Sequence, residues 1–452
     1  MQAATTYLKF IPLENLNLWD VKRYYTKNNL QFENVVTLWD ILKPYKKAVS
    51  KEEMIENKWQ IISKINFGGE LFLRDIEEIE TYKGSLNLVP DNAIIYSKIN
   101  VRHGCIYFHE VGQTPFGVSS EYPIFKFDET KVNGKFLHKV LRSSAFKKLL
   151  KTKTTGISKA RVKQDEFLDI EIPLPSLTEQ EAIVNNYYSK IKEAEALEKQ
   201  ASDLEEEIEW YFTEKLGIKA GTGIGLKKGL NFIEYSEILK WSLDTMNKVQ
   251  FTFDKSNFKT EKLKNLLMSF EGGKTPSKAR KDFWNGNIYW TSPKDFKGRM
   301  FLQSAEDTIT NLAVQESGIK VFPKGVFLSV FRSGILQHSF PTVVTEIETA
   351  INQDLKAYTL NEVLIDKLFY LYFVHTFKKY ILTLASKKSV TVESINTEDF
   401  LEIPIPLPPI SIQQEITNRI SALKSQTRQL KEKASILKQQ AEQEFEQEIF
   451  AS

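Results

Sequence analysis

The chain has 452 residues, of which 42% are hydrophobic, and this length predicts at least two domains because one hydrophobic core rarely serves more than about 300 residues. The single cysteine, Cys105, excludes an internal disulfide and a zinc site built from several thiolates, which fits a reducing cytoplasm. The sequence contains no apolar run of about 18 residues and does not begin with a basic-then-apolar pattern, so we expect neither a membrane span nor an export signal.

The net charge of +3 conceals an uneven distribution. Residues 178–216 contain eleven acids and four bases, and residues 411–450 contain six of each, so the rest of the chain carries +10. This division predicts a polyanionic partner for the basic parts and a protein partner for the acidic segment.

In chain order, the first predicted element is a mixed sheet between about residues 20 and 160, where β-branched and aromatic runs alternate with Gly and Pro turns. Residues 138–163 then carry nine bases and no acid, which is typical of a phosphate-binding surface and also of a solvated helix face. Because Phe146-Lys147-Lys148 recurs as Phe377-Lys378-Lys379, we favour nucleic acid. The candidate phosphate contacts are Lys147, Lys148, Lys151, Lys153, Lys378 and Lys379.

An internal repeat follows, in which residues 167–212 recur at 400–445 with a constant shift of 233. Nine of the seventeen aligned positions from Phe167 to Ile183 are identical, and both copies begin with a Pro-rich strap, at 167–175 and 400–408. Proline fixes an extended entry and is not expected inside a helix, so each strap should lead into a helix.

Both helical segments show the 3.5-residue apolar repeat of a left-handed coiled coil, in the same register. Two unrelated surface helices would not be expected to share a phase. Lys190 interrupts the first seam, and the neighbouring Ile191 can substitute for it. The predicted seam residues are Ile183, Tyr187, Leu197, Leu204 and Ile208 in the first copy and Ile416, Ile420, Leu423, Leu430 and Leu437 in the second.

The length of the connection between the repeats predicts how the helices pair. A helix over 178–216 would be about 58 Å long. Residues 217–231, which contain five glycines, could span at most about 50 Å and resemble a flexible joint. We therefore expect antiparallel helices related by a pseudo-twofold axis, with one globular domain near each end.

The second globular domain contains a Gly-rich loop at residues 272–278. It resembles a nucleotide-binding P-loop only in part, since Met268 stands where that motif has Gly and Pro276 stands where its helix should begin. Small hydroxyl and basic residues in such a loop are better suited to approaching a DNA backbone.

Motifs for catalysis are missing. The sequence has no Asn/Asp-Pro-Pro-Tyr type motif, Pro90-Asp91 lacks the downstream acid-x-Lys of a nuclease, and the five histidines show no metal-binding spacing. His103 and His109 are expected in or beside a strand. We expect no metal site and no chemistry in this chain.

A resemblance to a known family is carried by the tandem straps and by the loop Gly273-Lys274-Thr275-Pro276-Ser277, which is followed by Trp284-x-Gly286-x-Ile288-x-Trp290. The chain resembles the specificity (S) subunit of type I restriction-modification enzymes over essentially its whole length. The resemblance implies an α+β fold with two mixed α/β target recognition domains and two long antiparallel coiled-coil helices. The implied parts are target recognition domain 1 at 1–166, a conserved spacer helix at 167–216, a Gly-rich linker at 217–231, target recognition domain 2 at 232–399 and a second spacer at 400–452.

The same resemblance implies a non-catalytic, cytoplasmic subunit for phage defence. Each recognition domain would read half of a bipartite, asymmetric site in double-stranded DNA, and the spacers would fix the gap and dock two methyltransferase (M) subunits. S-adenosylmethionine would bind the M subunits and ATP with Mg²⁺ the restriction (R) subunits, so we expect no cofactor on this chain. Alternatives are the recognition part of a fused methyltransferase-nuclease and a structural coiled-coil scaffold.

The candidate base-reading or backbone-contacting residues differ between the domains. The first domain lacks the Gly-Lys-Thr-Pro-Ser loop, so its residues cannot be transferred from the second. We predict Lys64, Arg74, Lys98 and Arg102 in the first domain and Lys274, Thr275, Ser277, Lys278, Lys294, Arg332 and Gln337 in the second.

Overall fold

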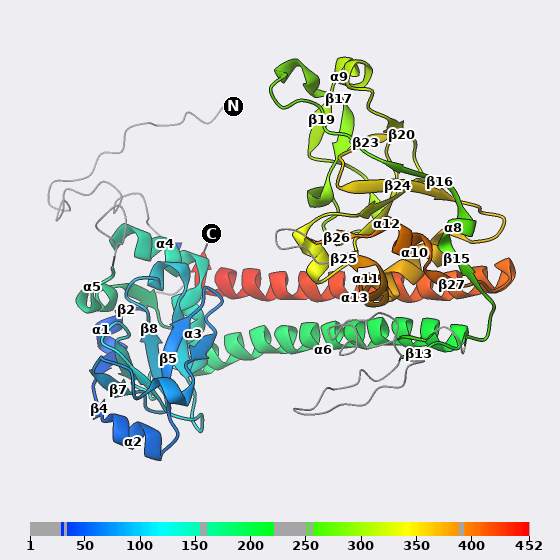
Figure 1. Cartoon of the computed structure of the whole chain (residues 1–452). Helices are drawn as coiled ribbons and strands as arrows, with labels where there is room; N and C mark the ends of the chain where they lie inside the picture. Colours follow the sequence, from blue (N-terminus) through cyan, green and yellow to red (C-terminus); the bar gives the residue numbers. More distant parts are fainter. Residues whose placement is uncertain are drawn as a thin grey trace. The chain divides into compact units, whose positions relative to one another are not determined.

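The computed structural model describes residues 29–30, 34–153, 161–220, 251–252, 256–387 and 393–451, so most of the predicted linker lies outside the described residues. The chain divides into two compact units, Met1–Glu198 with Lys431–Ser452, and Lys199–Leu430. Each unit contains one α/β domain and parts of the long helices α6 (Leu177–Leu216) and α13 (Ile410–Ile449) (Figure 1). None of the helices in the described ranges is long and apolar enough to cross a membrane.

In its described residues, the first unit is built around two larger sheets and five short helices that precede α6. Strand β1 (Asn29–Leu30) pairs with β28 (Phe450–Ala451) at the end of the chain. The other elements are β2 (Val35–Thr37), α1 (Leu38–Ile41), β3 (Leu42–Tyr45), β4 (Ala48–Val49), α2 (Lys51–Glu56), β5 (Gln60–Ile65), β6 (Leu71–Leu73), β7 (Leu86–Leu88), β8 (Ala93–Tyr96), β9 (Ile106–His109), β10 (Phe116–Val118), β11 (Ile124–Phe127), α3 (Gly134–Arg142), α4 (Ser144–Lys153), α5 (Gln164–Leu168) and β12 (Glu171–Pro173).

The second unit repeats this plan before α13. A short pair, β13 (Lys219–Ala220) with β14 (Phe251–Thr252), stands at its beginning. The other elements are β15 (Thr260–Lys262), α8 (Leu263–Leu266), β16 (Leu267–Gly272), β17 (Trp284–Thr291), β18 (Phe301–Leu302), β19 (Asp307–Ile309), α9 (Asn311–Ser317), β20 (Val321–Phe322), β21 (Phe327–Val330), β22 (Thr342–Thr345), β23 (Thr349–Ile351), β24 (Leu355–Leu360), α10 (Lys367–Thr376), α11 (Lys378–Ala385), β25 (Ser386–Lys387), β26 (Ser394–Ile395), α12 (Thr397–Leu401) and β27 (Pro404–Pro406).

The two domains share one sheet topology. The antiparallel order β3-β11-β8-β9 in the first corresponds to β16-β24-β21-β22 in the second, where β18 adds an edge. The order β6-β5-β10-β7 corresponds to β19-β17-β23-β20, and in both the central pair is parallel, β5 with β10 and β17 with β23. The repeat seen in the sequence at the straps and helices therefore extends through both domains.

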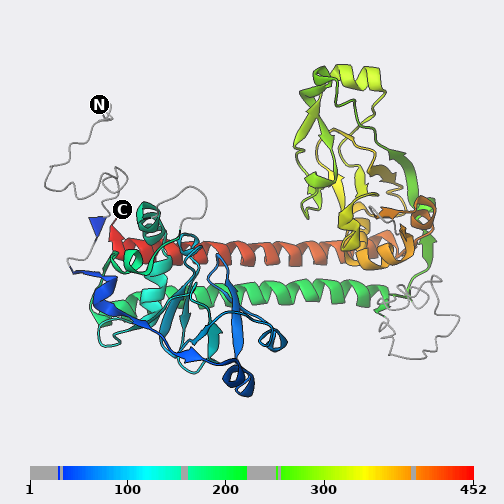
Figure 2. The same cartoon turned by 60° about the vertical axis from the view of Figure 1, so that its left-hand side comes forward.

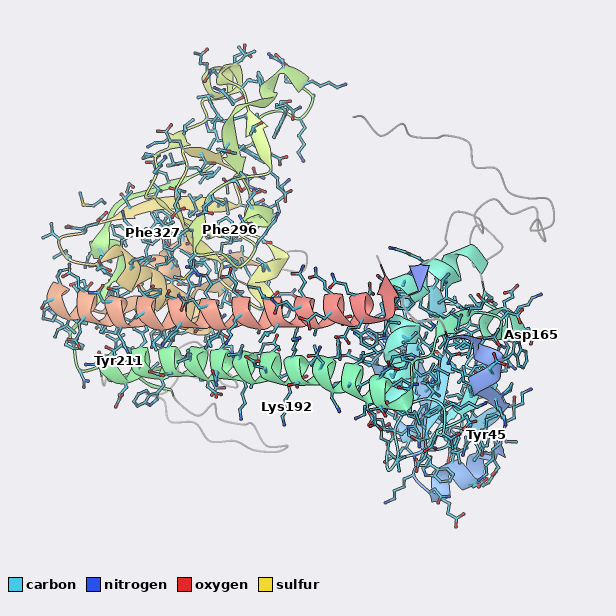
Figure 3. All side chains as sticks on the ribbon, turned by 180° about the vertical axis from the view of Figure 1, so that it is seen from behind. Tyr45, Asp165, Lys192, Tyr211, Phe296 and Phe327 are labelled. Atoms are coloured by element: carbon cyan, nitrogen blue, oxygen red, sulfur yellow. The ribbon has the colours of Figure 1, made fainter. Side chains whose placement is uncertain are left out.

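The cores explain why each strap begins with Phe-Leu. Strands β8 and β21 are buried along their whole length, as expected for strands covered on both faces. Phe167 stacks on Tyr96 of β8, with ring centroids 4.3 Å apart, and Phe400 packs against Phe331 at 5.1 Å. In the second domain, buried Phe327 belongs to the same core (Figure 3).

The straps are not extended throughout. Their Phe-Leu residues end the short helices α5 and α12, and only the following residues form strands, with β12 pairing with β2 and β27 with β15. Helix α6 begins at Leu177, where Ser176 and Glu179 form a capping box: the Ser176 amide donates to the Glu179 carboxylate at 2.8 Å, and the Glu179 amide to the Ser176 hydroxyl at 3.4 Å.

Helices α6 and α13 pair antiparallel within each unit (Figures 1 and 2). Ion pairs join positions whose numbers rise in one helix as they fall in the other: Lys190 with Glu444 and Lys438 with Glu198 in the first unit, and Arg419 with Glu207 and Lys215 with Glu415 in the second. The predicted fold class, two mixed α/β domains with two long antiparallel coiled-coil helices, is confirmed.

The ten predicted seam residues are all at least half-buried. The buried ones are Ile183, Ile208, Ile416, Ile420 and Leu423, and the half-buried ones are Tyr187, Leu197, Leu204, Leu430 and Leu437. Lys190, which interrupts the apolar pattern, is also half-buried, and its charge is neutralised by Glu444 of α13.

A buried glutamine fastens each domain to its helix. The Gln180 side chain of α6 is fully buried and donates to the carbonyl oxygens of Lys131 and Pro175, at 3.0 and 2.8 Å. Its oxygen accepts the amide of Asn133 at 2.8 Å, and Asn133 is the N-cap of α3. One amide group thus joins the domain, the strap and the helix.

Gln413 of α13 does the same in the second unit. It donates to the carbonyl oxygens of Leu364 and Pro408, at 3.1 and 2.8 Å, and accepts the amide of Asp366, the N-cap of α10, at 2.7 Å. Gln413 is also fully buried. We call these two residues the glutamine clamps.

A histidine recurs in the same way on α3 and α10. His138 Nε2 lies 3.2 Å from the carbonyl oxygen of Ile106, the first residue of β9, and His375 Nε2 lies 2.8 Å from that of Thr342, the first residue of β22. Burial lowers the pKa of each histidine to about 4, so both are neutral near pH 7.

Candidate nucleic-acid interface

The Gly-rich loop of the second domain lies directly against the backbone that follows β23. A Cβ atom at Gly273 would stand 2.2 Å from the carbonyl oxygen of Ile351, so only glycine fits there. The next amide, that of Lys274, donates to the same carbonyl oxygen at 3.0 Å. This close approach fixes the start of the loop.

Two tryptophans of β17 hold the rest of the loop. Trp290 Nε1 donates to the carbonyl oxygen of Lys274, and Trp284 Nε1 to that of Ser277, both at 3.1 Å. The two indoles meet edge to face, with centroids 5.1 Å apart. The Trp-x-Gly-x-Ile-x-Trp pattern therefore serves to shape the Gly-Lys-Thr-Pro-Ser loop.

The short segment Asn352–Asp354 joins this loop to the connection between β21 and β22. The Thr275 hydroxyl donates to the Gln353 side chain on one side. On the other side, the backbone amide of Arg332 donates to the carbonyl oxygen of Asp354 at 3.2 Å. Three connections thus meet in one surface, which we call the three-loop surface.

The three-loop surface carries five of the predicted residues as exposed side chains: Lys274, Ser277, Lys278, Arg332 and Gln337. Thr275 is half-buried. The Arg332 side chain is 65% exposed, with Nε 3.6 Å from Asp354 Oδ1, so Asp354 orients the guanidinium while leaving it accessible.

Lys294 differs from these residues. Its Nζ lies 3.0 Å from Asp307 and 3.3 Å from Glu306. Hydrogen bonding to Asp307, and then to Glu306, raises the pKa of Lys294. Because two carboxylates already balance its charge, this geometry favours a role for Lys294 within the domain over the predicted DNA contact.

The first domain has a corresponding surface with other side chains. The Lys98 amide donates to the carbonyl oxygen of Glu121 at 3.1 Å, as the Arg332 amide does to that of Asp354. Glu121 and Asp354 are separated by the repeat shift of 233 positions, and Lys98 and Arg332 by one position more. The Lys98 Nζ donates to the carbonyl oxygen of Ser120 at 2.7 Å. Lys98 and Arg332 therefore occupy corresponding places.

Arg102 and Gln337 also correspond. Both lie in the 3-10 turn that follows the central strand, directly after a buried apolar residue, Val101 in one domain and Leu336 in the other. The Arg102 Nε is 3.2 Å from His103 Nε2. At this place one domain presents a guanidinium and the other a carboxamide.

The other two candidates of the first domain lie on β5 and just after β6. Lys64 is exposed, and its Nζ lies 5.0 Å from the centre of the Phe72 ring. Arg74 is half-buried, donates to the carbonyl oxygen of Ile62 at 3.4 Å and lies 3.3 Å from Glu78. Arg74 is therefore partly committed to contacts within the domain, whereas Lys64 has an exposed ammonium.

Three bases of the tract 138–163 have partners within the chain. Lys139 pairs with Glu442, Arg142 donates to two backbone carbonyls, and Arg161 lies 3.3 Å from Glu121. Among the predicted contacts, Lys148 is exposed and Lys147 half-buried on α4.

The other four predicted phosphate contacts lie on α11 and α4. Lys378 and Lys379 are exposed on the first turn of α11, after the buried Phe377. Lys151 and Lys153 belong to the last turn of α4, but their side chains lie outside the described residues.

Sequence reasoning overlooked the residues that hold the interface in place. Gln180 and Gln413 were among the nine identities of the repeat, so their signal was present. Glu121 and Asp354 are also 233 positions apart, but a single acidic pair gives little signal by itself. His109 lies in β9 and His103 in the preceding turn, and no group of three His, Cys, Asp or Glu side chains in the described ranges could hold a metal ion.

Comparison with known proteins places these surfaces in context. Residues 255–439 match the family described as "Type I restriction modification DNA specificity domain". The EcoR124I/EcoR124II specificity subunit of Escherichia coli is 36% identical over 162 residues, which cover 36% of this chain and 40% of that protein. The MjaIX specificity subunit of Methanocaldococcus jannaschii is 28% identical over 153 residues, covering 33% and 34%. Each match thus spans less than half of the curated relative.

A solved structure is similar in fold over most of the chain. A chain from a structural study of complex assembly and conformational transition in a type I R-M system superposes with a TM-score of 0.59, at 16% identity, over 92% of this chain and 96% of that chain. Residues 255–439 are thus similar to the DNA specificity domain of type I restriction-modification systems, and the fold of the chain is similar to that of the solved type I R-M chain.

Proposed function

We propose that this chain recognises double-stranded DNA for a type I restriction-modification system, and that each α/β domain reads one half of a bipartite site. The observation that carries the proposal is the pair of corresponding surfaces with different side chains. Lys98 and Arg102 occupy in one domain the places that Arg332 and Gln337 occupy in the other.

The chemistry of these side chains fits an asymmetric site. Arg and Lys suit the acceptors of guanine in the major groove, whereas Gln suits the donor and acceptor of adenine. Backbone amides fix the loops that carry them, so the side chains are presented from rigid supports. One scaffold with two sets of side chains would read two different half-sites.

The helices fit a role in assembly and spacing. The exposed faces of α6 and α13 carry charged side chains such as Lys192, which projects from α6 (Figure 3), and the large apolar side chain of Trp210, which is 60% exposed. We assign these faces to two methyltransferase subunits and expect restriction subunits in the complete assembly. The chain itself would be non-catalytic, with S-adenosylmethionine and ATP with Mg²⁺ bound by those partners.

Mapping of methylated adenines in the host genome tests this function. We expect a gapped, asymmetric motif to be methylated in the parent strain and unmethylated after deletion of the gene for this chain, with recovery on complementation. A methylation pattern that is unchanged by the deletion would contradict the proposal.

A further inference from the structure

The tip of the β5–β6 hairpin, residues Asn66–Glu70, presents an exposed aromatic ring. Phe67 is 63% exposed. The turn is closed by the Gly69 amide, which donates to the Asn66 carbonyl oxygen at 3.0 Å, and by the Glu70 amide, which donates to Asn66 Oδ1 at 2.9 Å. The Asn66 amide group also binds the Glu70 carboxylate at 2.7 Å. Phe67 is thus held in a defined turn.

Arg142 of α3 fixes this turn to the rest of the domain. Its guanidinium donates to the carbonyl oxygens of Gly68 and Gly104, the latter at 3.2 Å from Nε. A Cβ atom at Gly69 would stand 2.3 Å from Arg142 Cζ, so the glycine allows the close contact. Arg142 thus joins the backbone of the turn to the backbone at Gly104, which makes the tip a rigid projection.

Basic side chains lie close to the turn that carries the exposed ring. The Phe67 and His103 rings lie 4.9 Å apart, and Arg102 contacts His103 at 3.2 Å. The Lys147 side chain passes over Gly104, where a Cβ atom would stand 2.7 Å from Lys147 Cε. Arg102 and Lys147 are two of the residues predicted from the sequence to contact DNA.

We propose that Phe67 is a wedge that stacks on a base pair step of the DNA half-site read by the first domain. This inference rests on the proposed function and adds a mode of recognition to it. An aromatic or apolar side chain that enters between base steps partly unstacks them and kinks the duplex. The neighbouring Arg102 and Lys147 would hold the flanking phosphates, which offsets the cost of unstacking.

The geometry also predicts which steps are favoured. Pyrimidine–purine steps unstack most easily, so the step under Phe67 should be of this type. The preference would arise without a hydrogen bond to any base, because the phenyl ring has no polar atom. Sequence selectivity at this position would therefore be read through DNA deformability.

The test uses the full-length chain and duplexes that carry its own site, mapped first by methylation sequencing, with 2-aminopurine placed in turn at each step of the half-site. Phe67→Ala should lower the specific affinity by about 5- to 100-fold, the range expected for loss of one aromatic–base stack. The salt dependence should not change, since no charge is lost. Phe67→Trp should retain binding. Unstacking by the parent chain should raise the 2-aminopurine fluorescence at one step, and this rise should persist with Phe67→Trp and disappear with Phe67→Ala.

Val111→Ala is the matched control, because Val111 is an apolar residue of the same domain and is 67% exposed. It should bind DNA as the parent chain does. If Phe67→Ala also binds as the parent chain does, or only loses assembly with methyltransferase subunits, the wedge is overturned and Phe67 belongs to another contact. If the parent chain itself shows no site-specific binding, the proposed function fails first.

Discussion

Replacing the buried Gln413 by alanine should destabilise the unit Lys199–Leu430 far more than replacing an exposed glutamine on the same helix would. The side chain makes three hydrogen bonds, to the Leu364 and Pro408 carbonyl oxygens and from the Asp366 amide. A net hydrogen bond contributes about 1 kcal/mol and a buried group left unpaired costs about 1 to 3 kcal/mol, so we expect a loss of about 3 to 5 kcal/mol. For a domain of this size the melting temperature should fall by about 6 to 20 °C.

Gln414→Ala provides a matched control on the same helix. Gln414 has the same side chain one position along, and it is exposed, so its replacement should change stability by less than about 0.5 kcal/mol. Thermal and urea unfolding would be followed by tryptophan fluorescence, which includes Trp284 and Trp290 of this unit and also Trp39 and Trp59 of the other unit. Hydrogen exchange measured by mass spectrometry should show faster exchange in peptides covering 364–367. Equal stability of the two variants, with unchanged exchange, would refute the clamp.

Three further predictions concern charge, pH and length. Burial lowers the pKa of His138 and His375 to about 4, so each contributes stability that is fully present above the unfolded pKa of 6.5 and is lost as pH falls toward 4. The free energy of unfolding should therefore drop by about 2 kcal/mol per histidine between pH 7 and pH 5. The double variant His138→Gln with His375→Gln should flatten this pH dependence when it is measured by chemical denaturation. Lys147→Glu with Lys148→Glu should weaken binding to all DNA sequences alike and reduce the slope of log K against log salt by about two contacts' worth, and an unchanged slope would assign these lysines to a solvated face. Inserting seven residues in the middle of both α6 and α13 keeps the seam in phase and lengthens the helices by about 10 Å. Methylation should then move to sites with about three more base pairs in the gap, or cease. Full methylation at the original spacing would exclude a spacing role for the helices.

The parts of the fold that recur in the sequence were predictable. The straps and helices repeat with one shift, because Phe167 and Phe400 fill corresponding cores and the helices share a buried seam. The common topology of the two domains was not visible, since its defining contacts are backbone hydrogen bonds. The Lys98 amide and the Arg332 amide make the same bond with unlike side chains, and such a bond places little constraint on residue type.

The candidate site was predictable as a set of loops and less so as a set of side chains. A basic residue in the sequence shows its charge but not its partner, and the partners are often distant in the chain. Lys139 is bound by Glu442, 303 positions away, and Lys294 by Glu306 and Asp307. The exposure of Lys274 and Lys278 instead follows from local structure, because the loop is tied to β17 through its backbone.

The central claim, that each domain reads its own half-site, is tested most directly by domain exchange. Residues 241–399 would be replaced by the corresponding domain of a relative with a different known site, and methylated adenines would be mapped in cells that carry the hybrid chain. We predict that one half of the bipartite motif changes to that of the relative while the other half and the gap stay the same. Simultaneous change of both halves would contradict the account, because it would mean that the two domains form one composite reading surface.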